Sequence, residues 1–235
     1  MKSHGLVSTF NFIPEGAYPD PVDARRWLQH TGFEVGVHDL KHDGRLYESR
    51  ESFRRSAGRI NGYLSRWNAV GFRSGFLLRE LNWLHDLDAS YDSSTFDTDP
   101  FEPQPEGSGT IFPFMVEREK GMEGAGYVEL PYTLAQDSTL FLLLGEDSID
   151  IWKRKLDWIA EHGGLALINI HPDFIDFSGR HSDGESYPCG RINELFDYLN
   201  SQYKGEFWNP LACDLAKWFK NSSQPPGLDS QPCDN

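Results

Sequence analysis

The stretch GFEVGVHDLKHDG, residues 32–44, decides the expected fold because an apolar strand pattern runs directly into two histidines. Gly36 interrupts the apolar residues and permits a close approach of another backbone, as in a buried strand. His38 and His42 follow where the strand gives way to a polar loop. Ligand-binding residues of α/β enzymes commonly lie at the carboxyl ends of strands, so the two histidines are candidate metal ligands. Histidines four apart are a weak signal alone, and solvated loop histidines are the alternative.

Composition excludes several classes of protein. The 235 residues are enough for one hydrophobic core, and 22 Lys+Arg against 36 Asp+Glu give a net charge of -14. Such a surface repels phosphate backbones and anionic lipids, so we expect neither a nucleic-acid nor a membrane partner. The longest apolar run, residues 139–144, is too short to span a membrane and predicts a buried strand. The first residues lack a signal-peptide core, which predicts a cytoplasmic protein, and the three scattered cysteines predict no disulfide framework.

Strand and helix patterns alternate along the chain, which predicts a mostly parallel sheet, either open or closed into a barrel. The expected strands are residues 7–13, 33–37, 69–72, 89–91, 110–116 and 165–170. The expected helices are residues 21–30, 51–67, 76–84, 147–162 and 192–203. We expect residues 1–220 to form a single domain and residues 221–235, rich in Ser, Gln and Pro, to form a disordered tail.

Three polar side chains follow three of these expected strands. His38, Arg73 and His171 each end an apolar segment. Because parallel strands share one carboxyl-end face, the fold should bring the three residues to that face although they are far apart in the sequence. Each has a simpler explanation: Arg73 could pair with one of the many acidic side chains, and His171 could be a core histidine bonded to a backbone carbonyl.

The segments around these residues resemble motifs of the polysaccharide deacetylases, carbohydrate esterase family 4 and its relatives. The metal-binding motif of that family resembles residues 32–38 together with His42, and the last motif resembles LINIHP, residues 167–172. GFR, residues 71–73, looks like the third motif, and STFNF, residues 8–12, resembles the strand next to the first motif. PYTL, residues 131–134, with Asp137 is a weaker match to a loop over the pocket. The resemblance covers about residues 6–173.

The resemblance implies a fold, an activity and a set of site residues. Relatives fold as a distorted (β/α) barrel and use a divalent metal, most often Zn²⁺, to remove N-acetyl groups from amino sugars. On this basis His38 and His42 are the expected metal ligands, His171 the general acid, and Arg73 the residue that orients the catalytic carboxylate. The expected partner is a carbohydrate substrate. The implied chemistry is a metal-activated water that attacks an amide, with proton transfer to the leaving amine.

One part of the family pattern is absent from this sequence. Relatives carry two aspartates on the first strand, one as base and one as the third metal ligand, and no such pair precedes residues 32–38. Either Phe10-Asn11 is a degraded copy of the pair, or residues 8–12 are the second strand of a barrel that is incomplete at the N-terminus; we favour the second. Asp39, Asp43, Asp137 and Asp173 are candidates to supply a missing carboxylate. The alternative function is a non-catalytic relative that keeps a carbohydrate-binding groove.

Overall fold

The computed structural model describes residues 1–16, 21–98, 106–119, 125–179 and 184–223. Its largest sheet has six strands in the order β1-β2-β3-β4-β6-β5, all parallel except β5, which is antiparallel to β6. These strands are β1 (Thr9–Phe12), β2 (Glu34–His38), β3 (Gly71–Arg73), β4 (Tyr91–Asp92), β5 (Phe114–Val116) and β6 (Tyr127–Glu129). A second sheet pairs β7 (Ile175–Asp176) with β8 (Tyr187–Pro188). The chain has the α/β fold and mostly parallel sheet that the sequence predicts.

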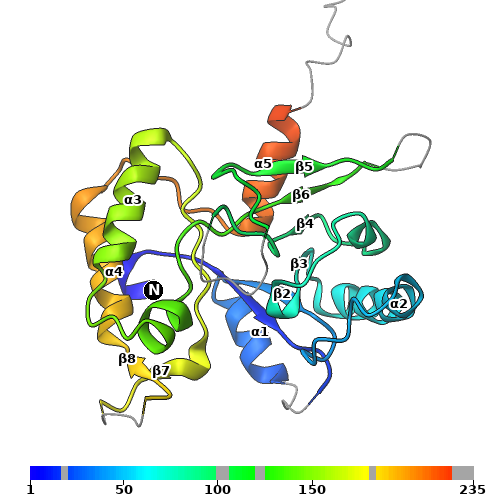
Figure 1. Cartoon of the computed structure of the whole chain (residues 1–235), viewed down its shortest axis with the longest axis horizontal. Coiled ribbons are helices and arrows are strands. Elements are labelled where there is room, and N and C mark those ends of the chain that lie inside the picture. Colours follow the sequence, from blue (N-terminus) through cyan, green and yellow to red (C-terminus); the bar gives the residue numbers. More distant parts are fainter. Residues whose placement is uncertain (17–20, 99–105, 120–124, 180–183, 224–235) are drawn as a thin grey trace, which may run out of the picture.

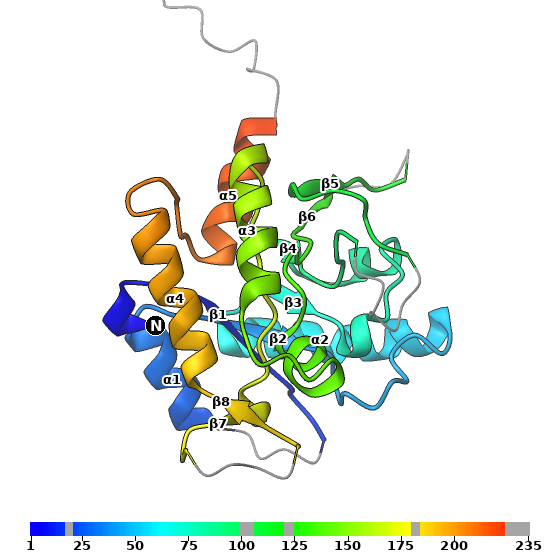
Figure 2. The same cartoon turned by 60° about the vertical axis from the view of Figure 1, so that its left-hand side comes forward.

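Helices surround the six-stranded sheet on several sides (Figure 1). They are α1 (Val22–His30), α2 (Arg50–Trp67), α3 (Asp150–His162), α4 (Gly190–Gln202) and α5 (Ala212–Ser223). α1 and α2 pack beside β2, and α5 packs against β4 and β6. α3 and α4 lie side by side, facing the viewer in Figure 2 and on the side away from α2 in Figure 1. No helix in the described ranges combines the length and the apolar character that crossing a membrane requires.

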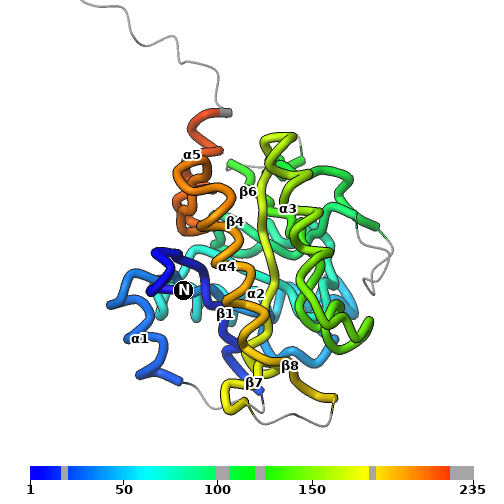
Figure 3. Tube along the Cα trace, turned by 90° about the vertical axis from the view of Figure 1, so that its left-hand side faces the viewer, coloured from blue at the N-terminus to red at the C-terminus, as the bar shows by residue number. Residues whose placement is uncertain are grey.

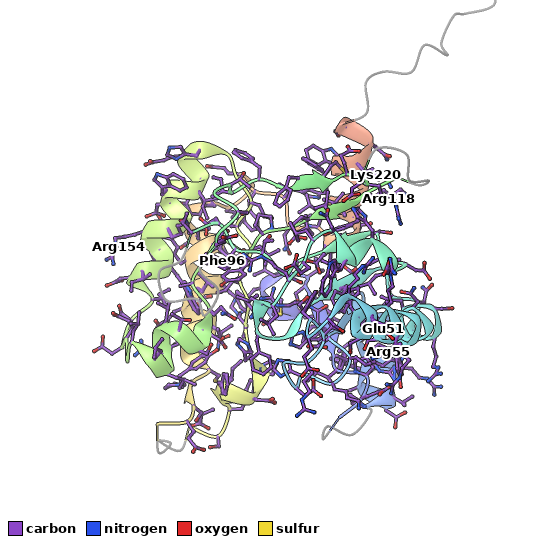
Figure 4. All side chains as sticks on the ribbon, turned by 45° about the vertical axis from the view of Figure 1, so that its right-hand side comes forward. Glu51, Arg55, Phe96, Arg118, Arg154 and Lys220 are labelled. Atoms are coloured by element: carbon purple, nitrogen blue, oxygen red, sulfur yellow. The ribbon has the colours of Figure 1, made fainter. Side chains whose placement is uncertain are left out.

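Two apolar clusters hold these layers together. One joins α2 to the outer face of β2 and β3, where Phe53 and Ile60 of α2 are fully buried with Val37 and Phe72. The other lies between α3 and α4 around Trp152, which is also fully buried. Polar side chains of α2 instead face outward: Figure 4 shows Glu51 and Arg55 on the periphery of the molecule, and Phe96 among its central elements. The amphipathic helices thus position the strands whose ends carry the candidate site.

Several expected elements are in place, and three are wrong. Residues 76–84 do not form a helix but two 3-10 turns, Gly75–Leu77 and Trp83–Asp86, because Phe76 and Leu77 adopt φ angles of 55° and 54°. Residues 139–144 are not a strand: they fall in a π-helical turn, Ser138–Leu143. Periodicity does not separate a short apolar strand from a buried helical turn. Residues 165–170, expected as a buried strand, form no strand and make one isolated bridge between Ile168 and Leu134; α5 was not predicted.

β1 lies at the edge of the six-stranded sheet. In the described part of the chain it pairs with β2 alone. Just before β1, the side chain of Asn209 meets the backbone of Val7: its Oδ1 accepts from the Val7 nitrogen at 2.8 Å, and its Nδ2 donates to the Val7 carbonyl at 3.3 Å. The N-terminal segment also runs beside α4, where the Asn200 amide donates to the His4 carbonyl (Figure 3). The C-terminal third of the chain therefore covers the start of β1.

The inner face of the sheet contains a polar layer below the strand ends. Glu34 is buried, and its carboxylate accepts from the Tyr91 hydroxyl at 2.8 Å, the Thr9 hydroxyl at 2.9 Å and the Cys213 backbone nitrogen at 3.0 Å. Cys213 lies in the first turn of α5, so Glu34 also caps that helix. Tyr91 crosses the backbone of Gly71, where a Cβ atom would lie 2.1 Å from the tyrosine oxygen.

We predict that Gly71→Ala destabilises the protein by about 1–3 kcal/mol, because the added methyl group overlaps the Tyr91 ring. Urea unfolding followed by circular dichroism measures the change. Gly58→Ala is the matched control: Gly58 is an exposed residue inside α2 with no atom near a built Cβ, so this change should stabilise the protein by about 0.5–1 kcal/mol. Equal changes in the free energy of unfolding for the two variants would show that overlap with the Tyr91 ring does not destabilise Gly71→Ala.

Candidate functional site

His38 is the last residue of β2 and pairs in register with Arg73, the last residue of β3. Its Nδ1 lies 3.0 Å from the Arg73 carbonyl oxygen, so Nδ1 carries the proton and Nε2 keeps its lone pair. Burial is the largest cause that lowers the pKa of His38 to about 3, and the charges of Arg73, His42 and His171 act in the same direction. His38 is therefore neutral near pH 7, the form in which imidazole binds a metal.

His42 lies beside His38 on a tightly curled loop. The two ring centroids are 4.8 Å apart, and the ring of Phe76 packs on the other side of His42 at 4.4 Å. Asp39 and His42 have φ angles of 56° and 53°, in the left-handed region that non-glycine residues rarely adopt. Gly75 lets the loop approach, since a Cβ atom there would lie 2.5 Å from the Asp39 carboxylate and 3.0 Å from the His42 ring. The strained curl turns His42 back toward His38.

The two histidines are the right kind of ligand for zinc, but two ligands are too few for a catalytic zinc site. Two neutral imidazoles are good zinc ligands, yet catalytic zinc sites take three protein ligands. Across the described ranges no three His, Cys, Asp or Glu residues are arranged to hold a metal ion. The described residues thus bring together two imidazoles where a catalytic zinc site needs three ligands, and they do not fit a complete site. The assignment of His38 and His42 as metal ligands stays a prediction.

Three of the four candidate carboxylates are unsuited to act as a general base, because of their hydrogen bonds or their position. Asp39 is buried and accepts from the backbone nitrogen of Leu40 at 2.5 Å; burial is the largest cause that raises its pKa. Asp43 accepts from the Arg45 backbone nitrogen at 3.1 Å in an exposed turn. Asp173 is exposed on the 3-10 turn Pro172–Phe174. None of these three carboxylates is therefore placed as a general base for a bound substrate would be.

Asp137, the fourth candidate, is committed to His171. Its carboxylate is fully buried, and Oδ1 lies 2.7 Å from His171 Nδ1 and 2.8 Å from the backbone nitrogen of Ser138. Oδ2 accepts from the His171 backbone nitrogen at 2.8 Å and from the Tyr187 hydroxyl at 2.7 Å. Asp137 begins the turn Ser138–Leu143, and Tyr187 comes from β8. From the sequence, Asp137 was a candidate carboxylate beside the weak loop match at residues 131–134, and Tyr187 was not predicted.

Arg73 points into the protein rather than to solvent. It is 5 % exposed, its Nη1 donates to the Ser93 carbonyl at 2.7 Å, and its guanidinium lies 5.5 Å from the centre of the Tyr132 ring. Its charge also acts on the nearby Asp92 carboxylate and opposes the rise in the pKa of Asp92 that burial causes. A simple surface ion pair is excluded for Arg73, and its predicted role of orienting a catalytic carboxylate remains a prediction.

A pair of buried acids lies next to Arg73. Asp92 and Glu129 are register partners on β4 and β6, and both are fully buried. Glu129 accepts from the backbone nitrogen and hydroxyl of Thr95 at 3.0 and 2.7 Å, and Asp92 accepts from the backbone nitrogen and hydroxyl of Ser94. Burial, followed by the charge of Asp92, raises the pKa of Glu129 well above its ordinary value. We expect Glu129 to keep its proton at pH values where an exposed glutamate has lost it.

Comparison with solved structures places the fold among the deacetylases. An inferred polysaccharide deacetylase from Mycobacterium smegmatis superposes with a TM-score of 0.70 over 98% of this chain and 78% of its own, at 18% identity. The PuuE allantoinase has a TM-score of 0.62 over 94% of this chain and 70% of its own, at 16% identity. A 4-α-glucanotransferase from Thermococcus litoralis reaches 0.54 over 86% of this chain and 32% of its own, at 14% identity.

No family model matches the sequence, and no curated protein matches it in a sequence search. The likeness is therefore one of structure at low identity. It bears out the predicted fold class, a mostly parallel α/β sheet of the distorted-barrel type found in polysaccharide deacetylases.

We predict that the protein binds Zn²⁺ weakly, because two imidazoles without an acidic ligand make an incomplete site. Competition with a chromogenic chelator measures the affinity. His42→Ala should weaken binding by roughly 10-fold or more. His30→Ala, which removes an exposed imidazole at the end of α1, should leave it unchanged. Equal losses in both variants would show that zinc binds the surface unspecifically.

We predict that Glu129→Gln makes stability less dependent on pH. The raised pKa means that the folded protein keeps a proton that the unfolded chain releases, so this contribution is complete below the ordinary pKa and is lost as pH rises through the folded value. The stability of the variant relative to the parent should therefore increase with pH above about 4.5. Urea unfolding at a series of pH values tests this. Glu161→Gln on the exposed side of α3 is the control and should show no trend.

Proposed function

We propose that the protein is a deacetylase-like hydrolase that cleaves the amide of an N-acetylated amino sugar or polysaccharide. The observation that carries the proposal is the pair Asp137–His171, an oriented imidazole at the carboxyl-end face of a deacetylase-like fold. His171 is 35 % exposed at its side chain whereas Asp137 is fully buried, as expected of a proton-transfer group that a hidden carboxylate holds in place. His38 and His42 are the second element of the proposed site.

His171, Phe76 and Arg73 would each have a separate role in the reaction. His171 gives a proton to the amine that leaves when the amide breaks. The exposed ring of Phe76, beside His42, offers an apolar face on which a sugar ring can pack. Arg73 supports the site from below, because its backbone carbonyl fixes the tautomer of His38. A divalent metal at His38 and His42 remains part of the proposal as a weakly bound ion, and no step is assigned to it.

A second candidate is a non-catalytic protein that binds carbohydrate through the same surface. It is favoured by one observation: the described residues provide neither a third metal ligand nor a carboxylate base. Such a protein would bind N-acetylated sugar oligomers without releasing acetate. Both candidates therefore bind N-acetylated sugar oligomers, but only the hydrolase releases acetate from them.

We predict that the protein releases acetate slowly from oligomers of N-acetylglucosamine and that His171→Ala lowers the rate by about 10²- to 10⁴-fold. An enzyme-coupled acetate assay, run with and without added Zn²⁺, measures the rate. His30→Ala is the matched control for the loss of an imidazole and should retain the parent rate. Binding of the oligomer by calorimetry, with no acetate above the uncatalysed rate in either condition, would contradict the hydrolase and support the non-catalytic candidate.

A further inference from the structure

The contacts of Asp137 fix the protonation pattern of His171. Four donors converge on this buried carboxylate: the backbone nitrogens of Ser138 and His171, the hydroxyl of Tyr187, and His171 Nδ1 at 2.7 Å. A carboxylate that accepts three other hydrogen bonds is ionised and can only accept from the imidazole. Nδ1 of His171 therefore carries a proton, and in the neutral ring the lone pair lies on Nε2.

The side chain next to Nε2 agrees with this pattern. The Asn169 amide nitrogen lies 3.4 Å from His171 Nε2 and donates to the Gln136 carbonyl oxygen at 2.5 Å. An amide nitrogen has two hydrogens and no acceptor capacity, so its second hydrogen can only be offered toward the Nε2 lone pair. At 3.4 Å this contact is long, and a water molecule or substrate group can replace it. Asn169 is thus a positioning residue for a ring that is ready to accept a proton.

The other candidate carboxylates near the site do not orient a histidine in this way. Asp39 is buried under the His42 loop and hydrogen-bonded to backbone nitrogen, and Asp43 is folded onto its own turn. Asp173 lies exposed on the turn that follows His171. Among the described residues, the Asp137–His171 pair is the one arrangement that combines an ionised orienting group with a partly exposed lone pair.

We propose that His171 is both the general base and the general acid of the reaction, with Asp137 holding its tautomer throughout; this rests on the proposed hydrolase function. In the first step, water loses a proton to His171 Nε2 while its oxygen forms a bond to the acyl carbon. In the second step, Nε2–H returns that proton to the amide nitrogen as the carbon–nitrogen bond breaks. As the carbon–nitrogen bond breaks, the oxyanion of the tetrahedral adduct reforms the carbonyl. The products are therefore the free amine and acetic acid, which then ionises to acetate by losing its proton to solvent, and His171 is neutral again. No further reactant is needed.

Several titratable groups face His171. Asp137 contacts its Nδ1, Tyr187 donates to the same carboxylate, and His38 lies within electrostatic range across the site. Asp173 follows on the same turn, and Phe174 packs on the ring with centroids 5.4 Å apart. A base must be unprotonated in the free enzyme, so kcat/KM should rise with pH through the titration of His171. A residue acting only as an acid gives the opposite slope.

The test combines a pH profile with nitrogen NMR of the histidine side chains in the full-length protein. We expect kcat/KM for acetate release from N-acetylglucosamine oligomers to rise along a limb that coincides with the NMR titration of His171, and His171→Gln to abolish the limb. Tyr187→Phe removes one donor to Asp137 and keeps the buried ring, so it should move the limb to higher pH by up to about one unit. The neutral His171 should show the Nδ1–H tautomer.

Two results would overturn the inference and identify what failed. A rate that only falls as His171 loses its proton, or an Nε2–H tautomer in the neutral ring, would limit His171 to the acid role while leaving the hydrolase function intact. An Nδ1–H tautomer with no acetate release under any condition would show that the ring is prepared as described but that the proposed function is wrong.

Discussion

The buried carboxylate of Glu34 is the interaction on which much of the structure depends. A carboxyl group in the interior is tolerated only when its oxygens are hydrogen-bonded, and Glu34 obtains its donors from three separate parts of the chain. Thr9 belongs to β1, Tyr91 to β4, and the Cys213 nitrogen to the first turn of α5. One side chain of β2 thus ties the edge strand, the middle of the sheet and the last described helix together. The site lies above this layer, at the opposite end of the same strand.

Much of the fold could be predicted from the sequence because strands and amphipathic helices have different periods. The strand at residues 33–37 and the helix at residues 51–67 are nearly as expected, since both have clear apolar patterns and recognisable ends. The errors fall where tertiary contacts overrule the local pattern. Residues 76–84 look helical, but Phe76 and Leu77 adopt positive φ where the chain folds over Asp39. α5 was not predicted, and its first turn is held by a glutamate far away in the sequence.

The candidate site was predictable only in part, because the side-chain partners in it depend on tertiary contacts. The positions of His38, Arg73 and His171 at strand ends follow from the order of strands and helices alone. The partners of these residues do not. The tautomer of His38 depends on a carbonyl of the neighbouring strand, and the orientation of His171 depends on Asp137 and Tyr187, which lie 34 and 16 residues from it in opposite directions along the chain. Such contacts are set by the folded structure, and a single sequence has no local pattern that encodes them.

The Asn209 side chain beside Val7 has a consequence for the behaviour of the protein at high concentration. A primary amide carries one acceptor and two donor hydrogens on adjacent atoms, so it imitates a peptide group of a neighbouring strand. Edge strands with free backbone groups recruit other chains and promote aggregation, and natural proteins protect them with local devices. Here one carboxamide from the segment between α4 and α5 blocks the start of such pairing. By occupying these backbone groups, Asn209 should reduce the tendency of this edge to pair with a second molecule.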